Sequence, residues 1–346
     1  MYRKFYKLEK KPFDLAPNPE APFLSEAHEE ALAILRYGVM SKKGFLLLTG
    51  DVGTGKTTML QVLINSPDMM GVKLCMLSNP TLNVNEFYYY IADKYGFEYH
   101  DNKARFLDDF SEFLHSLHER GERALFIVDE AHALPTKLLE EVRLLSNQDR
   151  VGQSVLSIFL VGQPELNQKL AQERLLPLRQ RIGIRFHLKP FSEKETASYI
   201  QDKLSHAGAK DYKIFTDEAI RYIYRASKGT PRLINIICDH ALLSGFADSK
   251  PVIDENIIKE CVRELHAPGD QTELPVGSSQ RPMLKGFFSW KGASWATVAL
   301  VILVLVLLVG NYVLYASDVA WLESVLPEWM MNLLRQMSKY FGGSFG

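Results

Sequence analysis

Gly50-Asp51-Val52-Gly53-Thr54-Gly55-Lys56-Thr57 follows directly on the apolar run Phe45–Thr49. A buried strand that leads through a glycine-rich loop into a helix is typical of a nucleotide-phosphate site, because the glycines let backbone N–H groups turn toward the phosphates. We expect the Lys56 ammonium to reach the β- and γ-phosphates and the Thr57 hydroxyl to bind Mg²⁺. The predicted nucleotide-binding residues run from Gly50 to Thr58, and the nucleotide is ATP or GTP.

A second apolar run ends in two acids, Ala124-Leu-Phe-Ile-Val-Asp129-Glu130-Ala-His132. The carboxyl ends of neighbouring parallel strands meet at one edge of a sheet. We therefore expect Asp129 to join the Mg²⁺ shell and Glu130 to stand where an attacking water would be held. The alternative is that both acids only cap the following helix. His132 is predicted to start that helix close to the nucleotide.

Length and composition limit the number of domains and the kinds of site that the chain can contain. With 346 residues, 47% of them hydrophobic, and a formal net charge of −1, the chain can hold two or three domains, and its overall charge indicates no particular partner. The three cysteines are widely spaced, without a CxxC pair or nearby histidine ligands, so a disulfide framework or a zinc site is not expected. Buried, reduced thiols fit a cytosolic domain.

The composition changes near the carboxyl end, where no charged residue occurs between Lys291 and Asp318. A membrane-spanning helix needs about 20 apolar residues, so we predict one transmembrane helix over 294–315. Arg281, Lys285 and Lys291 precede it, whereas acids follow it, and the positive-inside rule therefore places the amino-terminal part in the cytoplasm. A flexible linker over 267–293 precedes the span. A short amphipathic tail over 316–346, periplasmic in this orientation, is expected to lie on the membrane or to pack on a partner's helix.

Strands and helices alternate through the first part of the chain, which predicts an α/β fold with a parallel sheet. The strands are expected near Phe45–Thr49, Lys73–Leu77, Leu125–Asp129, Leu156–Val161 and Ile184–Leu188. Amphipathic helices alone follow, over 193–206, 217–227, 232–247 and 254–265. An α/β nucleotide-binding domain over 1–190 with a helical lid over 191–266 resembles the layout of the AAA+ ATPases.

The AAA+ resemblance implies further site residues. Gln163, after the strand that ends at Val161, stands where sensor 1 orients the water or touches the γ-phosphate, unless it only starts the next helix. Arg179 or Arg181 precedes the last strand, where an arginine finger reaches the nucleotide of a neighbouring subunit, unless both belong to a solvated basic face. Arg232, in Gly229-Thr-Pro-Arg232, resembles sensor 2 and would couple lid closure to the nucleotide.

The opening residues resemble a narrower family, the general secretion pathway protein A (ExeA/GspA) ATPases. Its motifs are met over Met1–Pro19, Phe23–His28, Val161–Leu166, Leu178–Ile182 and Gly229–Arg232. The resemblance implies a homo-oligomeric, membrane-anchored ATPase of the bacterial inner membrane, using ATP and Mg²⁺. It implies assembly of an envelope machine (type II secretion, a type IV pilus or polysaccharide export) with a GspB-like inner-membrane partner. Longer members carry a peptidoglycan-binding domain beyond the membrane helix; this sequence is expected to be a short form without one.

Three other functions compete with that of an envelope-assembly ATPase. A DEAH helicase needs a second RecA-like domain, for which the sequence leaves no room. A DNA-handling AAA+ ATPase of transposition or initiator type stays open, although no basic stripe with interleaved aromatics indicates nucleic-acid binding. A slow nucleotide-dependent assembly switch also stays open, although Glu130 argues against a site unable to hydrolyse.

Overall fold

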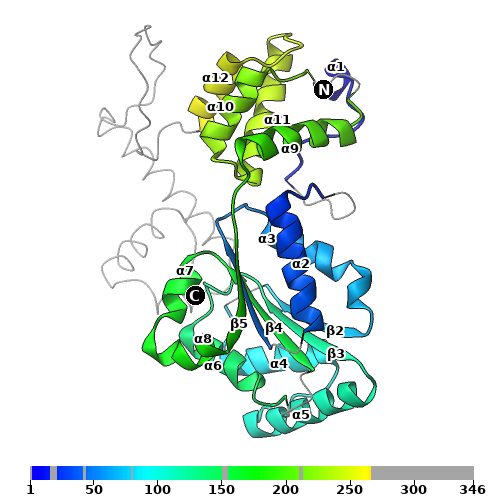
Figure 1. Cartoon of the computed structure of the whole chain (residues 1–346), viewed down its shortest axis with the longest axis vertical. Coiled ribbons are helices and arrows are strands. Elements are labelled where there is room, and N and C mark those ends of the chain that lie inside the picture. The colour runs from blue at the N-terminus through cyan, green and yellow to red at the C-terminus, as the bar shows by residue number, and fades with distance from the viewer. Residues whose placement is uncertain are drawn as a thin grey trace, which may run out of the picture. The chain divides into compact units, whose positions relative to one another are not determined.

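Five parallel strands form the centre of the part that carries the glycine-rich loop (Figure 1). The strands are β1 (Phe45–Gly50), β2 (Val72–Leu77), β3 (Arg123–Val128), β4 (Leu156–Gly162) and β5 (Ile182–Leu188). This computed structural model describes residues 2–15, 22–41, 44–78, 81–149, 155–209 and 213–265, which fall within one compact unit. The predicted strands are confirmed to within two residues, and the sheet is parallel as expected.

The strand order, β2-β3-β4-β1-β5, puts β1 between β4 and β5 and places β3 beside β4. All carboxyl ends therefore point to one edge. There the loop after β1, the acids after β3 and the residues after β4 come together, as expected from the sequence.

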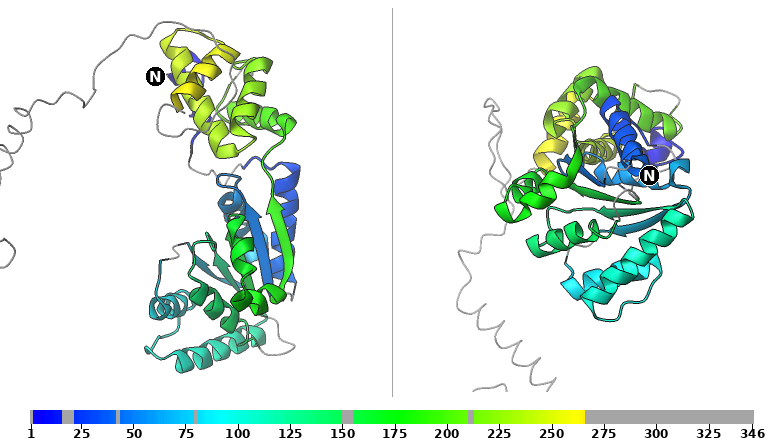
Figure 2. Two further views of the ribbon diagram at one scale, coloured as in Figure 1. Left: turned by 90° about the vertical axis from the view of Figure 1, so that its left-hand side faces the viewer. Right: turned by 60° about the horizontal axis from the view of Figure 1, so that its bottom comes forward.

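Helices cover both faces of the sheet (Figure 2), and successive side chains of a strand face opposite layers. Along β1, Phe45 and Leu47 pack into one core, whereas Leu46 and Leu48 pack into the other. The first core is closed by α4 (Val84–Tyr95), α5 (Lys103–Glu119), α6 (Thr136–Leu145), α7 (Glu165–Leu170) and α8 (Leu176–Arg181). The second is closed by α2 (Glu26–Met40) and α3 (Lys56–Ile64). Short 3₁₀ turns occur at Pro67–Met69 and Glu173–Leu175.

A helical part with its own core follows the last strand. It consists of α9 (Glu193–His206), α10 (Asp217–Ser227), α11 (Pro231–Ala247) and α12 (Glu255–Leu265), which agree with the four predicted helices to within one residue. The three cysteines are buried and form no disulfide, as expected.

The amino-terminal segment, with α1 at Tyr2–Phe5, packs on these helices rather than on the sheet. The Tyr2 hydroxyl donates to Asp239 Oδ1 at 2.6 Å, and the Tyr6 hydroxyl donates to the Lys250 carbonyl at 3.0 Å. The predicted division at residue 190 therefore assigns residues 2–13 to one part although their apolar side chains bury in the core of the other. No local pattern could reveal this, because the contacts join residues more than 230 positions apart.

Three predicted segments lie outside the described residues: the linker over 267–293, the transmembrane helix over 294–315 and the tail over 316–346. Within the described ranges, no helix combines the length and apolarity needed to cross a bilayer.

Candidate active site

The loop between β1 and α3 is built around two glycines with positive φ. Gly53 has φ = 78° and Gly55 has φ = 100°, conformations that residues with a Cβ rarely adopt. Space matters as well, because a Cβ on Gly53 would lie 2.7 Å from the Cβ of Arg232. Gly55 caps α3 without a side-chain bond, so the N–H groups of the first turn remain available to an anion. The backbone therefore fits a phosphate group.

Lys56 lies inside this loop and is only 5% exposed. Its ammonium group donates to the carbonyl oxygens of Gly50 at 2.8 Å and Asp51 at 2.9 Å. Burial lowers the pKa of Lys56, while the carboxylates of Glu130 and Asp129 oppose that shift. A buried ammonium held by weak neutral acceptors can exchange them for phosphate oxygens, which form stronger charge-assisted bonds.

Thr57 and Asp129 meet as the sequence predicted. The Thr57 hydroxyl donates to Asp129 Oδ2 at 3.0 Å, and the other carboxylate oxygen accepts from the Glu130 N–H at 2.9 Å. Asp129 is the first residue after β3, one position beyond the observed end of the strand. A hydroxyl next to a carboxylate is an oxygen donor set suited to Mg²⁺, so these residues fit the predicted metal.

His132 connects the two predicted water-handling residues. Its Nδ1 lies 3.3 Å from Glu130 Oε2, and its Nε2 lies 3.0 Å from Gln163 Nε2. Nδ1 also accepts from the Gln163 backbone N–H at 3.4 Å, so the ring contacts both the backbone and the side chain of Gln163. The prediction that His132 starts a helix is wrong: it lies in the turn before α6, which begins at Thr136. Pro135 precedes that helix, and because residues before a proline are biased away from helical geometry, the helix starts after it.

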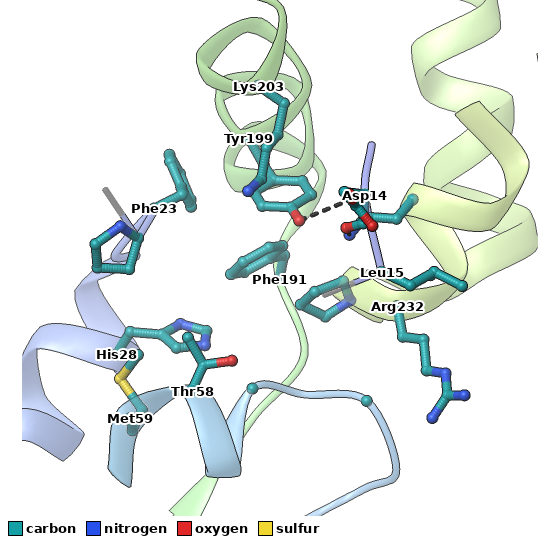
Figure 3. Close-up of a pocket in the computed structure, with 15 residues that line it drawn as sticks. Asp14, Leu15, Phe23, His28, Thr58, Met59, Phe191, Tyr199, Lys203 and Arg232 are labelled. Carbon is teal, nitrogen blue, oxygen red and sulfur yellow. Dashed lines mark hydrogen bonds between the residues drawn. The ribbon is translucent and has the colours of Figure 1, made fainter. Parts of the chain in front are cut away.

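An aromatic cavity of about 290 Å³ adjoins the loop (Figure 3). The rings of Phe23, Phe191 and Tyr199 contact one another with centroids 5.2–5.5 Å apart. The Tyr199 hydroxyl donates to Asn235 Oδ1 at 2.8 Å. Further lining residues include Gly53, Gly55, Thr58, Met59 and Lys203. Flat apolar rings beside a phosphate loop suit a nucleobase, whose faces stack on aromatic side chains.

The three predicted arginines lie in two places. The backbone N–H of Arg232 donates to the Gly53 carbonyl at 3.3 Å, which brings the start of α11 against the phosphate loop. Figure 3 shows its guanidinium group directed away from the aromatic rings. Arg179 and Arg181 are exposed on α8. Arg181 hydrogen-bonds to Ser146 after α6, and the Arg179 carbonyl accepts from Arg185 at 2.9 Å. The structure thus leaves both side chains outside their own chain's phosphate loop.

Sequence reasoning missed the aromatic cavity and His28, whose ring lies within hydrogen-bonding distance of the loop at Thr54. Phe23 and His28 both occur in the opening motif, but only as markers of a resemblance. Neither has a spacing that predicts contact with residues 54, 191 or 199, so no local signal was available.

Comparison with known proteins places a family model described as AAA domain on residues 39–170. General secretion pathway protein A of Aeromonas hydrophila is 39% identical over 249 residues, covering 71% of this chain and 45% of that protein. The Holliday junction branch migration complex subunit RuvB of Oenococcus oeni is 26% identical over 253 residues, covering 66% of this chain and 62% of RuvB. The crystal structure of Cdc6p from Pyrobaculum aerophilum has a TM-score of 0.58 at 16% identity, covering 72% of this chain and 70% of that one, which shows a shared fold.

These findings confirm the predicted AAA+ fold and the resemblance to general secretion pathway protein A. The chain matches less than half the length of the Aeromonas relative.

Proposed function

Because an AAA domain model matches residues 39–170, we propose that this chain hydrolyses ATP with Mg²⁺ at the carboxyl edge of the sheet. The observation that carries the proposal is the meeting of Thr57 with Asp129 beside the Lys56 loop. Lys56 and the backbone N–H groups from Gly50 to Thr58 bind the phosphates. Thr57 and Asp129 hold the metal, which neutralises phosphate charge when bound. The aromatic cavity takes the adenine.

In this proposal Glu130 orients and deprotonates the attacking water, and Gln163 positions it from the next strand. His132 is 3.3 Å from the carboxylate of Glu130 and 3.0 Å from the Gln163 amide, so it fixes the position of these two side chains relative to each other. Arg232 responds to the γ-phosphate from the start of α11. Because Arg179 and Arg181 are exposed on α8, either of them can act on the nucleotide of a neighbouring subunit in a homo-oligomer.

We further propose that the ATPase cycle drives or regulates assembly of a cell-envelope machine serving type II secretion, a type IV pilus or polysaccharide export. The 39% identity to general secretion pathway protein A supports this role. The uncharged run between Lys291 and Asp318 supports a single-pass anchor in the inner membrane, with the ATPase cytoplasmic and the tail periplasmic. The partner is an inner-membrane assembly protein, GspB-like or equivalent.

The test is a Glu130→Gln variant, in which ATP binds but the water is not activated. We expect kcat to fall about 10²-fold or more while ATP affinity is kept. The full-length variant, purified from membranes with ATP, is analysed for co-purifying proteins by mass spectrometry, with Lys56→Ala as the non-binding control. Envelope-assembly proteins enriched with Glu130→Gln over Lys56→Ala would support the role. Enrichment of recombinases or replication proteins would contradict it.

The alternative is a DNA-handling ATPase, which the 26% identity to RuvB favours. Duplex and single-stranded DNA are added to the wild-type chain while ATP hydrolysis is followed. A stimulation of several-fold that salt removes would favour this alternative, because phosphate contacts are salt-sensitive. A wild-type turnover too slow to measure, with tight ATP binding, would favour the assembly switch.

A further inference from the structure

His28 lies where three segments meet: the start of α2, the phosphate loop and the segment before α9. It is 3% exposed. Its ring packs on Phe191 with the centroids 5.2 Å apart, and it lines the aromatic cavity (Figure 3). A buried histidine in such a place requires polar partners, and their identity determines what the ring can do.

The first partner is the phosphate loop. Nε2 of His28 lies 3.0 Å from the Thr54 carbonyl oxygen. Because a carbonyl only accepts, Nε2 carries the proton and donates it. The ring also limits the loop sterically, since a Cβ on Gly55 would lie 2.9 Å from Nε2. His28 therefore holds the loop at Thr54, two residues before Lys56.

The second partner is Ser25, whose hydroxyl lies 2.7 Å from Nδ1. Ser25 is the N-cap of α2 and is 4% exposed. Because Nε2 carries the ring proton, Nδ1 is unprotonated and the Ser25 hydroxyl donates to it. Ser25 therefore fixes the orientation in which the ring meets Thr54.

The third contact is Phe191, which lies directly before the capping box of Ser192 and Glu195 that starts α9. Glu195 Oε2 accepts from the Ser192 N–H and the Ser192 hydroxyl, each at 2.7 Å. Burial raises the pKa of Glu195, but the bonds from Ser192 outweigh it and hold that pKa below its usual value. His28 thus contacts the phosphate loop through Thr54 and the segment before this capped helix through Phe191.

We propose that His28 is a positioning residue that ties the phosphate loop at Thr54 to Phe191, directly before α9, with Ser25 orienting the ring. Nucleotide bound to the loop then stabilises the position of α9, and α9 in turn stabilises the loop that binds the nucleotide. The inference rests on the proposed ATP binding and adds a residue outside the glycine-rich loop, the two acids after β3 and the sensor positions. Its direct consequence is on nucleotide binding, because His28 contacts the loop and not the attacking water.

Two substitutions separate hydrogen bonding from packing. His28→Phe keeps a flat ring against Phe191 but removes both polar contacts. His28→Gln keeps an N–H donor within reach of Thr54. In the full-length protein, we expect His28→Phe to raise KM for ATP about 10-fold, the loss of roughly one hydrogen bond in a buried site, with kcat within about twofold of wild type. We expect His28→Gln to recover most of that KM. The exposed His240 supplies the control His240→Gln.

A second pair of variants tests the role of the Ser25 hydroxyl independently of how His28 variants fold. Ser25→Ala removes the hydroxyl that orients His28, whereas Ser192→Ala removes the capping hydroxyl of α9, which bonds to Glu195 and not to His28. We expect Ser25→Ala to raise KM about 5-fold or more and Ser192→Ala to leave KM within about twofold, although both remove a helix-capping hydroxyl.

The outcomes are distinguishable. If wild type hydrolyses ATP, Lys56→Ala does not, and His28→Phe and Ser25→Ala keep a wild-type KM, the inference is overturned while the proposed ATPase stands. Equal KM changes in Ser25→Ala and Ser192→Ala would also overturn it, because capping alone would explain them. If wild type binds no ATP, the proposed function itself fails.

Discussion

Glu130 adopts a backbone conformation that side chains usually avoid. Its φ is 52°, which costs a non-glycine residue roughly 1–2 kcal/mol. Two bonds hold the turn: the Glu130 N–H to Asp129 Oδ1 at 2.9 Å, and the Ala131 N–H to the Val161 carbonyl at 2.8 Å. These bonds offset the strain at the point where β3 and β4 end side by side. The turn of the backbone directs the Glu130 carboxylate toward His132. Strained residues of this kind concentrate at functional sites.

The contact between His132 and Glu130 gives a prediction about turnover. We expect His132→Ala to lower kcat about 10-fold with little change in KM, because the ring holds the carboxylate and the Gln163 amide but lies outside the phosphate loop. Steady-state ATP hydrolysis checks this. In a double variant with Glu130→Gln the two effects should not add, since both act on one network. Fully additive losses in kcat would show that His132 acts elsewhere.

The buried His28 gives a prediction about acid stability. Burial lowers its pKa, although the bond to Thr54 and the charge of Glu195 oppose the shift. Below the ordinary value of about 6.5 the unfolded chain therefore binds more protons than the folded chain, so stability falls as pH falls toward the folded-state pKa. We expect the melting temperature of His28→Gln minus that of wild type to increase as the pH is lowered from about 7.5 to about 5.5. A difference independent of pH would contradict this.

At the scale of elements, the joint between β5 and α9 depends on Gly229. Its φ is 73°, and an added Cβ would lie 1.9 Å from the Phe191 carbonyl oxygen. The Gly229 carbonyl accepts from the Phe191 N–H at 2.9 Å. The segment that enters the lid therefore lies directly against the turn that starts α11, and only glycine fits there.

Gly229→Ala should accordingly destabilise the chain by at least about 2 kcal/mol, because backbone strain and overlap with a carbonyl act together. Gly96→Ala is the matched control. Gly96 also has a positive φ, 84°, but a Cβ there meets nothing within 4 Å, so we expect a loss of about 1 kcal/mol. Thermal unfolding of both variants gives the comparison. Similar melting temperatures would mean that the turn at Gly229 can move away from Phe191.

At the scale of the whole molecule, both the α/β part and the helical part reach the proposed nucleotide site. The loop after β1 carries the proposed phosphate contacts, and Tyr199 of α9 and Asn235 of α11 line the cavity next to it. A ligand that touches both parts in the folded chain stabilises it in proportion to its affinity.

Mg²⁺ and ATP should therefore raise the melting temperature. At a concentration about 100 times Kd, the gain is about 2.7 kcal/mol in the free energy of unfolding. Chelation with EDTA in the presence of ATP should remove most of the gain, because Thr57 and Asp129 would then lack the cation that they are proposed to hold. Lys56→Ala should show no ATP-dependent shift. An equal gain with and without Mg²⁺ would contradict the assignment of Thr57 and Asp129 to the metal.

The sequence alone determined the parallel sheet, the glycine-rich loop and the meeting of Thr57 with Asp129. These depend on local patterns: apolar runs of strand length, glycines before a helix, and the rule that parallel strands end at one edge. The starts of the lid helices were also predictable, because caps such as Ser192 and Thr216 precede the periodic apolar residues.

Only the tertiary structure decided the placement of His28, His132 and the amino-terminal residues 2–13. Each depends on contacts between segments far apart in the chain: His28 with Thr54, His132 with Gln163, and Tyr2 with Asp239. Periodicity and spacing report the environment of a residue relative to its own helix or strand. The packing of the layers decides which distant surface a residue contacts. That packing depends on the burial of all three hydrophobic cores together.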